Sequence, residues 1–292
     1  MRRYLAILFL TVVLALGAQA QMKVASLHPL LTEMAQVVGG DSLVVVDLFP
    51  PNGELHDFEP QPGDVAAAAG SRLLLACGKG VEPYLAGLKD SLSADTKLVE
   101  LGNDVPDAAL PGGRGNDPHW WNCPANMKRA ARSLATALAA ADPAHAETYR
   151  SGSRKYAAEM DKLDREARLA LSAIPAERRV LATGHAAMCH FCAQYGFTPI
   201  PVYGIAKESQ GDTAGMARLL AELRAHGVRC LFHEWSESPR AMESLAAQTG
   251  ATTRPLILDG ICPDRKGYAA IFRENVRNIV AGLADSPAAG QQ

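Results

Sequence analysis

Strand-like and helix-like segments alternate in both halves of this chain of 292 residues, and one long helical pattern separates the halves. Strands that alternate with helices favour parallel sheets with right-handed crossovers. The sequence therefore predicts an α/β fold with two parallel-sheet lobes. The expected strands are 23–27, 43–49, 72–77, 97–101, 179–183, 198–202, 229–232 and 254–258, and the expected lobe helices are 29–38, 62–69, 186–195, 213–226, 239–249 and 267–283.

The segment 124–171 differs from both lobes because it is rich in Ala, Leu, Lys, Arg and Glu. Asp142 followed by Pro143 is typical of a helix start, with the proline at the first helical position. Apolar side chains then recur at helical spacing, which predicts about 30 residues of helix, or roughly 45 Å. An amphipathic surface helix is the simpler interpretation, but the strand–helix alternation resumes directly afterwards. We therefore expect one rigid helix, 143–174, that joins the lobes.

The first 20 residues have the features of a secretory signal peptide. Two arginines precede an apolar run from Tyr4 to Leu16, and small residues follow up to Ala20. The run is too short for a comfortable membrane span, which argues against a membrane anchor. No cysteine follows it, which argues against a lipoprotein. We expect a cleaved signal peptide, 1–20, and a mature chain in a periplasm.

The formal net charge of −2 becomes more negative when the two arginines of the leader are removed. The absence of a basic stripe argues against nucleic acid as a partner. The remaining length is sufficient for two medium domains in a monomer. We expect an N-terminal lobe over 21–142, the linking helix over 143–174, a C-terminal lobe over 175–285 and a flexible tail over 286–292.

Six cysteines, an even number in an oxidising compartment, permit disulfides without proving them. Cys77 ends an expected strand and Cys123 follows soon after a candidate ligand, so both should face one rim of a sheet; this pair is the first choice for a disulfide bond. Cys189 and Cys192 lie one helical turn apart, which fits a redox role, a second metal, a small disulfide or plain packing. The full set is Cys77, Cys123, Cys189, Cys192, Cys230 and Cys262.

Four potential metal ligands lie far apart in the sequence, each after an expected strand or at a strand-to-helix turn. They are His56, His119, His185 and Asp259. Any one alone is readily explained as an ordinary polar residue, but ligands collect at the carboxyl ends of parallel strands. Two would come from each lobe, which predicts a metal site in the interlobe cleft. Three imidazoles and one carboxylate suit a tetrahedral divalent ion, with Zn²⁺ the leading candidate.

The other histidines have more ordinary interpretations. His28 precedes a proline at a strand end and could line the cleft. His190 follows His185 by five residues and points to another side of the expected helix. His233 lies beside Glu234 and could support the site without touching a metal. The roles of these three stay open at this point.

The motifs around the candidate ligands resemble those of a known family, the solute-binding proteins of zinc and manganese ABC importers (cluster A-I, or cluster 9). The resemblance covers nearly all of the mature chain. The matching segments are Gly53-Glu-Leu-His-Asp-Phe-Glu-Pro, Asp117-Pro-His-Trp-Trp, His185-Ala-Ala-Met-Cys-His-Phe, Gly227-Val-Arg-Cys-Leu-Phe-His-Glu and Asp259. The resemblance implies two lobes joined by one long helix, and a metal held by His56, His119, His185 and Asp259.

The chain departs from the family pattern in places. Ala186 and His190 stand where the family usually has Asp and Tyr, and 102–116 lacks the histidines of the long loop in many zinc members. Manganese-selective members typically present a carboxylate at the position of His185. An imidazole there favours zinc, with manganese or iron as the alternative.

The resemblance implies a periplasmic zinc-capture protein that is not an enzyme and that serves an ABC permease. A periplasmic metallochaperone is a further candidate partner. The rival from another class is a secreted zinc hydrolase, with Asp259 or Glu234 as base and an exchangeable water on the metal. The lack of a His-Glu-x-x-His motif argues against it. A third class, a surface adhesin on the same scaffold, is opposed by the missing lipoprotein cysteine.

Overall fold

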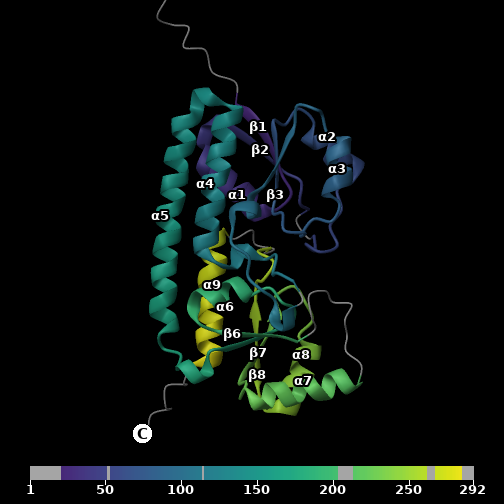
Figure 1. Ribbon diagram of the computed structural model, residues 1–292, viewed down its shortest axis with the longest axis vertical. Helices are drawn as coiled ribbons and strands as arrows, with labels where there is room; N and C mark the ends of the chain where they lie inside the picture. The colour runs from purple at the N-terminus through teal and green to yellow at the C-terminus, as the bar shows by residue number, and fades with distance from the viewer. Residues whose placement is uncertain (1–20, 51–52, 114, 203–212, 262–266, 285–292) are drawn as a thin grey trace, which may run out of the picture.

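Two α/β units are stacked along the long axis of the molecule in the computed structural model (Figure 1), which describes residues 21–50, 53–113, 115–202, 213–261 and 267–284. The predicted signal peptide and C-terminal tail lie outside the described residues. The strands are β1 Met22–Ser26, β2 Leu43–Asp47, β3 Leu73–Ala76, β4 Lys97–Glu100, β5 Val180–Thr183, β6 Thr198–Pro201, β7 Cys230–Glu234 and β8 Thr252–Leu256. The helices are α1 Pro29–Gly39, α2 Pro62–Ala68, α3 Leu85–Ser91, α4 Pro124–Ala141, α5 Ala146–Leu171, α6 Cys189–Tyr195, α7 Thr213–Ala225, α8 Arg240–Thr249 and α9 Tyr268–Leu283.

Both sheets are parallel and have the same strand order. The first runs β2-β1-β3-β4 and the second runs β6-β5-β7-β8. Within the first, Val24 lies opposite Val45 on one side and Leu73 on the other. The order in which strands are added to the sheet reverses between β1 and β3, and again between β5 and β7. Open α/β sheets bind ligands at such switch points. The prediction of two parallel-sheet lobes is confirmed.

Helix α5 runs alongside both units (Figure 1) and packs against α1 and α4 of the first and α9 of the second. It is 26 residues long, and a 3-10 turn, Pro143–His145, precedes it. The predicted helix therefore exists, but its first turn is tighter than an α-helix. Gly152 permits a close approach to α1, because a Cβ there would lie 2.2 Å from the Val38 carbonyl oxygen. The lobe boundaries at 142 and 174 stay a prediction.

Several element boundaries differ from the sequence prediction by one or more residues, and two of these lie near the candidate ligands. Helix α6 begins at Cys189 rather than 186, where the Asp117 carboxylate of the other lobe accepts its first N–H group at 2.8 Å. Strand β8 ends at Leu256 rather than 258. The amide of Ile257 donates instead to a side chain of α9. In both places a backbone N–H group donates to a side-chain oxygen and not to the backbone carbonyl oxygen that a longer helix or strand would supply.

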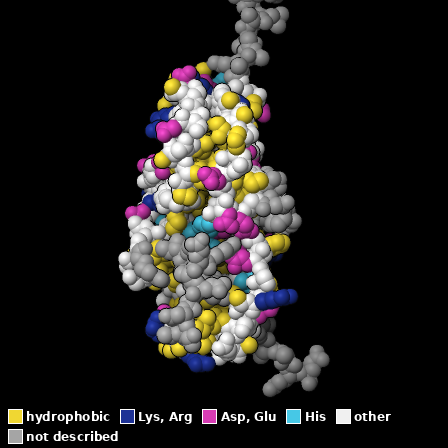
Figure 2. Space-filling model, turned by 90° about the vertical axis from the view of Figure 1, so that its right-hand side faces the viewer, with side chains coloured by type: hydrophobic (Ala, Val, Ile, Leu, Met, Phe, Trp, Pro, Cys, Tyr) yellow, Lys and Arg dark blue, Asp and Glu magenta, His cyan; other side chains and the backbone are white. Residues whose placement is uncertain are grey.

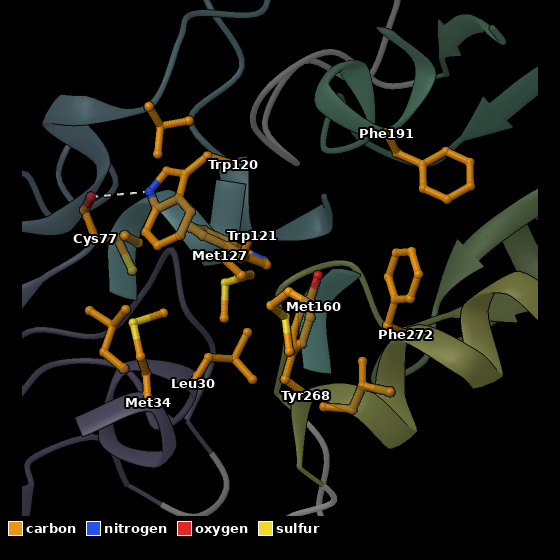
Figure 3. Packing of buried hydrophobic residues seen from close by; sticks show 14 of the residues in the cluster. Leu30, Met34, Cys77, Trp120, Trp121, Met127, Met160, Phe191, Tyr268 and Phe272 are labelled. Atoms are coloured by element: carbon orange, nitrogen blue, oxygen red, sulfur yellow. Dashed lines mark hydrogen bonds between the residues drawn. The ribbon is translucent and has the colours of Figure 1, made fainter. Parts of the chain in front are cut away.

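The large hydrophobic core takes side chains from both units (Figure 3), which holds them together along α5 and α9. Trp120 and Trp121 lie at its centre and are buried. The Trp120 indole donates to the Cys77 carbonyl oxygen at 3.1 Å, as the dashed line in Figure 3 shows. Gly102 leaves room for this contact, because a Cβ there would lie 2.6 Å from the Trp120 Nε1 atom. The Trp120 indole thus anchors the chain directly after His119.

Candidate metal centre

The structure brings the four predicted ligands together. One donor atom each from His56, His119, His185 and Asp259 lies within 4.8 Å of all the others. The Nε2 atoms of His56 and His119 are 3.2 Å apart, and the Asp259 Oδ1 atom lies 3.2 Å from the Nε2 atom of His185. The same oxygen lies 3.7 Å from the Nε2 atom of His56 and 3.8 Å from that of His119. The donors surround one point between the lobes.

These spacings suit a four-coordinate ion. A tetrahedral metal with bonds of about 2.0–2.1 Å separates its donor atoms by about 3.3–3.4 Å. The three imidazole rings are mutually tilted, with interplanar angles of 72°, 85° and 62°. Tilted rings let each nitrogen lone pair point at a shared centre instead of stacking. The geometry therefore fits a metal better than an aromatic cluster.

Two atoms of the cluster are buried without a hydrogen bond. These are the His185 Nε2 atom and the Asp259 Oδ1 atom. They lie 3.2 Å apart, but the angles between them are not those of a hydrogen bond. A buried polar atom without a partner costs about 1–3 kcal/mol, so native proteins rarely keep one without a reason. A cation between the two atoms would satisfy both.

His119 is held by Asp117, two residues before it. The Asp117 Oδ1 atom accepts from the backbone N–H group and from the Nδ1 atom of His119, both at 2.8 Å. A carboxylate on Nδ1 fixes the proton there and leaves the Nε2 lone pair free for a metal. Both side chains are fully buried. The Trp121 ring packs edge-on against the imidazole, with ring centroids 5.2 Å apart, as expected for a shielding indole.

His56 occupies a loop whose apolar flanks are anchored. Leu55 is buried before it, and Phe58 packs edge-on against Phe49, with ring centroids 5.0 Å apart. The polar residues between them therefore turn outward. The His56 side chain is 36% exposed, whereas that of His119 is fully buried. Figure 2 shows histidine and acidic side chains beside each other at the surface, about midway along the molecule.

Asp259 follows Leu258, whose two backbone groups are both held by side chains. Its N–H group donates to the Glu234 Oε2 atom at 2.9 Å. Its carbonyl oxygen accepts from the Trp121 indole at 2.9 Å and from the Asn122 amide at 2.8 Å. The last two donors belong to the lobe that carries His119. A ligand from one lobe is thus tied to the other lobe.

The charges of the site are coupled. Burial would lower the pKa of His185, but the Asp259 carboxylate beside it outweighs burial and raises that pKa above 6.5. Burial would raise the pKa of Asp259, but contacts with His185 and His56 hold that pKa well below 3.8. Burial and the nearby Asp259 raise the pKa of Glu234 well above its usual value. Asp259 is therefore ionised across the physiological range, and an incoming cation competes with a proton on His185.

The three other histidines of interest use their ring nitrogens elsewhere. Burial lowers the pKa of His28 to about 4, and its Nε2 atom donates to the Asp259 carbonyl oxygen at 3.0 Å. His190 donates from Nε2 to the Asp117 carbonyl oxygen at 2.9 Å. His233 has its Nδ1 atom 3.0 Å from the Glu234 carbonyl oxygen. None of the three joins the cluster of donor atoms.

The sequence analysis missed Asp117 and Asn122, which position ligands without joining the site. Asp117 lies two residues before a histidine across a proline, a spacing that lets its carboxylate fold back on the following backbone. That signal was present in the sequence. Asn122 gave no such signal, because its partners, Ala187 and Leu258, lie 65 and 136 residues further along the chain.

The predicted disulfide between Cys77 and Cys123 is wrong for this structure. All five described cysteines are free and buried, and Cys262 lies outside the described residues. The two thiols face different surroundings. Burial and the neighbouring Glu82 raise the pKa of Cys77, whereas Cys123 is buried near Asp164 of α5. The two cysteines therefore do not share the surroundings that the sequence prediction assumed.

None of the helices within the described ranges combines the length and the apolar character that a membrane span requires.

Comparison with known proteins places the chain among metal carriers. The model of the family described as zinc-uptake complex component A, periplasmic, matches residues 24–282. The iron-binding protein YfeA of Yersinia pestis is 29% identical over 269 residues, which is 90% of this chain and 86% of that protein. The manganese ABC transporter substrate-binding lipoprotein PsaA of Streptococcus anginosus is 26% identical, over 90% of each chain.

Solved structures agree with this placement. A crystal structure of a ZnuA deletion mutant with zinc bound is 26% identical, has a TM-score of 0.80 and covers 92% of this chain and 100% of its own. A manganese-bound periplasmic metal-binding protein from Candidatus Liberibacter asiaticus has a TM-score of 0.81 at 19% identity, over 90% of this chain and 100% of its own, and shows the shared fold.

Proposed function

Because the chain belongs to the family of periplasmic zinc-uptake component A, the metal-binding substrate-binding proteins of ABC importers, we propose that it captures one Zn²⁺ and delivers it to an inner-membrane permease. The proposed ligands are His56, His119, His185 and Asp259. No bond is made or broken. The family carries metal for a transporter and is not a family of enzymes.

The observation that carries the proposal is the buried pair of polar atoms without hydrogen bonds, His185 Nε2 and Asp259 Oδ1, inside a ring of further donors. The two atoms lie 3.2 Å apart, and a cation held among all four donors would satisfy both. Three imidazoles and one carboxylate whose donor atoms lie within 4.8 Å of one another support zinc over magnesium or calcium, which prefer oxygen. Relatives named for iron and manganese make those ions the alternative cargo.

The chemistry of capture follows from the positions of the protons. Asp117 keeps the proton of His119 on Nδ1, so the Nε2 atom needs no rearrangement to bind. His185 must release any proton it shares with Asp259 as the cation enters. The ionised Asp259 offsets one of the two positive charges of the cargo. Because the His56 side chain is 36% exposed, we expect the cation to enter the site from solvent on the side of His56.

The rival hydrolase requires an open metal position and a free base. Four protein donors leave no place for a water in a tetrahedral shell. Glu234 cannot easily act as the base, because it is buried and its two oxygens accept the N–H groups of Trp235 and Leu258, at 3.1 and 2.9 Å. These contacts support storage of the metal over hydrolysis.

We further propose the organisation expected from the sequence: a cleaved leader 1–20, lobes at 21–142 and 175–285, the helix 143–174 between them, and a tail 286–292. The mature protein acts as a monomer. A periplasmic metallochaperone remains a candidate partner for loading. N-terminal sequencing of the periplasmic protein should begin near Gln21; an intact leader would refute the cleavage.

The test is a titration of the metal-free protein with Zn²⁺ against a chromophoric chelator. One tight equivalent per chain is expected, and Mn²⁺ or Fe²⁺ should not displace it at equal concentration. The matched control is His226→Ala, which removes an exposed histidine and should bind like the wild type. Two tight equivalents, or displacement by Mn²⁺, would refute the proposed zinc stoichiometry or selectivity.

A further inference from the structure

His28 is the structural counterpart of His185 in the other lobe. Each lies two residues after the last residue of the first strand of its sheet, β1 or β5. In each, the hydroxyl of that last residue donates to the carbonyl oxygen of the histidine, Ser26 to His28 at 3.0 Å and Thr183 to His185 at 2.7 Å. The sheets share one strand order, so the two imidazoles occupy equivalent places.

The two imidazoles nevertheless do different things. The Leu30 N–H group donates to the Nδ1 atom of His28 at 3.1 Å, so that nitrogen carries the lone pair and the proton of the neutral ring is on Nε2. This Nε2–H group donates to the carbonyl oxygen of Asp259 at 3.0 Å. His185 instead faces the carboxylate of the same residue, with Nε2 3.2 Å from Oδ1. Equivalent histidines of the two lobes thus meet at Asp259.

The carboxylate of Asp259 needs such a support. Its Oδ1 atom is buried and accepts no hydrogen bond, and the three imidazole nitrogens lie around it at 3.2, 3.7 and 3.8 Å, so no hydrogen bond at that atom fixes its direction before a cation arrives. Its direction therefore depends on the backbone that carries it. Gly260 has φ +70°, and a Cβ there would lie 2.4 Å from the Leu30 Cδ1 atom, so this backbone is seated directly on α1.

We propose that His28 is a positioning residue: its hydrogen bond across the lobes fixes the Asp259 backbone so that the carboxylate is aimed at the three imidazoles before the metal binds. This inference rests on the proposed function, because His28 can position a metal ligand only if Asp259 binds the metal. His28 touches no metal. It also caps α1 through Leu30, so it has one contact in each lobe.

Two substitutions separate the contacts of His28. In His28→Asn the amide oxygen can take the place of Nδ1 and cap α1, but the side chain is too short to reach Asp259. In His28→Gln the amide N–H group can take the place of Nε2 and reach Asp259, while the cap is weakened. The Asn variant should bind Zn²⁺ about tenfold more weakly, as for other outer partners of metal ligands. The Gln variant should stay within about twofold of the wild type.

The experiment measures Zn²⁺ affinity by chelator competition and melting of the metal-free proteins for wild type, His28→Asn, His28→Gln and His119→Ala. Both His28 variants should melt below the wild type, because a buried ring is lost. Only the Asn variant should lose affinity. His28→Ser, another good cap that cannot reach Asp259, repeats the Asn arm if that variant does not fold.

Equal Zn²⁺ affinity of the Asn and Gln variants, whether both normal or both reduced, would overturn the inference. If His28 only stabilised the fold, affinity would change with the melting temperature and not with the ability of the side chain to reach Asp259. Loss of binding in His119→Ala with normal binding in His28→Asn would overturn the inference alone. A wild type that binds no Zn²⁺ would overturn the proposed function and the inference with it.

Discussion

His119 and His56 face the same point from the same lobe, yet their surroundings differ. His119 is fully buried, and Asp117 holds its backbone and its ring. His56 lies on a loop with 36% of its side chain exposed. We therefore expect one part of the proposed site to be formed before the metal arrives and the other part to admit it. Rigid buried donors supply affinity, and the exposed donor supplies access.

The largest effect should come from the buried ligand. His119→Ala removes a donor that is fully buried and leaves a position that solvent does not reach directly, so we expect at least about a 100-fold loss of Zn²⁺ affinity. Chelator competition measures it. Melting of the metal-free variant should stay cooperative, because the ligand lies between elements and not within one. Wild-type affinity in this variant would remove His119 from the ligand set.

A substitution at Asp117 tests whether the hydrogen bonds that orient His119 contribute to metal affinity. Asp117→Asn removes the negative charge that keeps the proton of His119 on Nδ1. If the amide oxygen still accepts from His119, the new NH₂ group faces the Cys189 N–H group, so two donors oppose each other there. We expect about a 10- to 100-fold loss of affinity, measured in the same way. A loss below twofold would show that the buried half of the site is not held by this carboxylate.

The exposed ligand should matter less. In His56→Ala, solvent water can fill the open fourth position, as in catalytic zinc sites with three protein ligands. We expect about a tenfold loss of affinity, mostly through faster release, which stopped-flow mixing with excess chelator resolves. A loss of affinity equal to that of His119→Ala would contradict the distinction between the preformed, buried His119 and the exposed His56 that admits the metal.

Acidity should produce the smallest effect near neutral pH. The pKa of His185 is raised, so its proton begins to compete with the metal at a pH above 6.5. Affinity should fall a few-fold between pH 8 and pH 7 and further as the pH is lowered, because a proton on His185 excludes the metal from that nitrogen. The zinc-induced rise in melting temperature should shrink in the same direction. An affinity that is constant from pH 8 to pH 6 would contradict a site built mainly from histidine.

The same pKa shifts predict the stability of the metal-free protein. The raised pKa of His185 stabilises the fold at pH values below 6.5, and this contribution is lost as pH rises through the folded value. The lowered pKa values of His28 and His190 act oppositely: they favour the fold above 6.5, and that contribution is lost as pH falls. His28→Gln should therefore weaken the acid sensitivity of the metal-free melting temperature, and an unchanged pH profile would contradict this.

The sequence predicted most of the fold because its signals are local. Apolar strands, the Asp142–Pro143 helix start and the strand-end positions of the ligands all lie within short windows. Two of the boundaries that differ, at 189 and 256, depend on Asp117 and Asn275, whose partners lie far along the chain. The disulfide prediction failed because the surroundings of Cys77 and Cys123 are likewise set by residues distant in the sequence, Cys123 lying near Asp164.

The central claim is that three imidazoles and one carboxylate form the metal shell. X-ray absorption at the zinc edge of the loaded protein tests it directly. We predict three nitrogens and one oxygen at about 2.0–2.1 Å, with the outer-shell scattering of three imidazole rings. A sulfur neighbour at about 2.3 Å, which would bring a cysteine into the site, or fewer than two imidazoles would contradict the account.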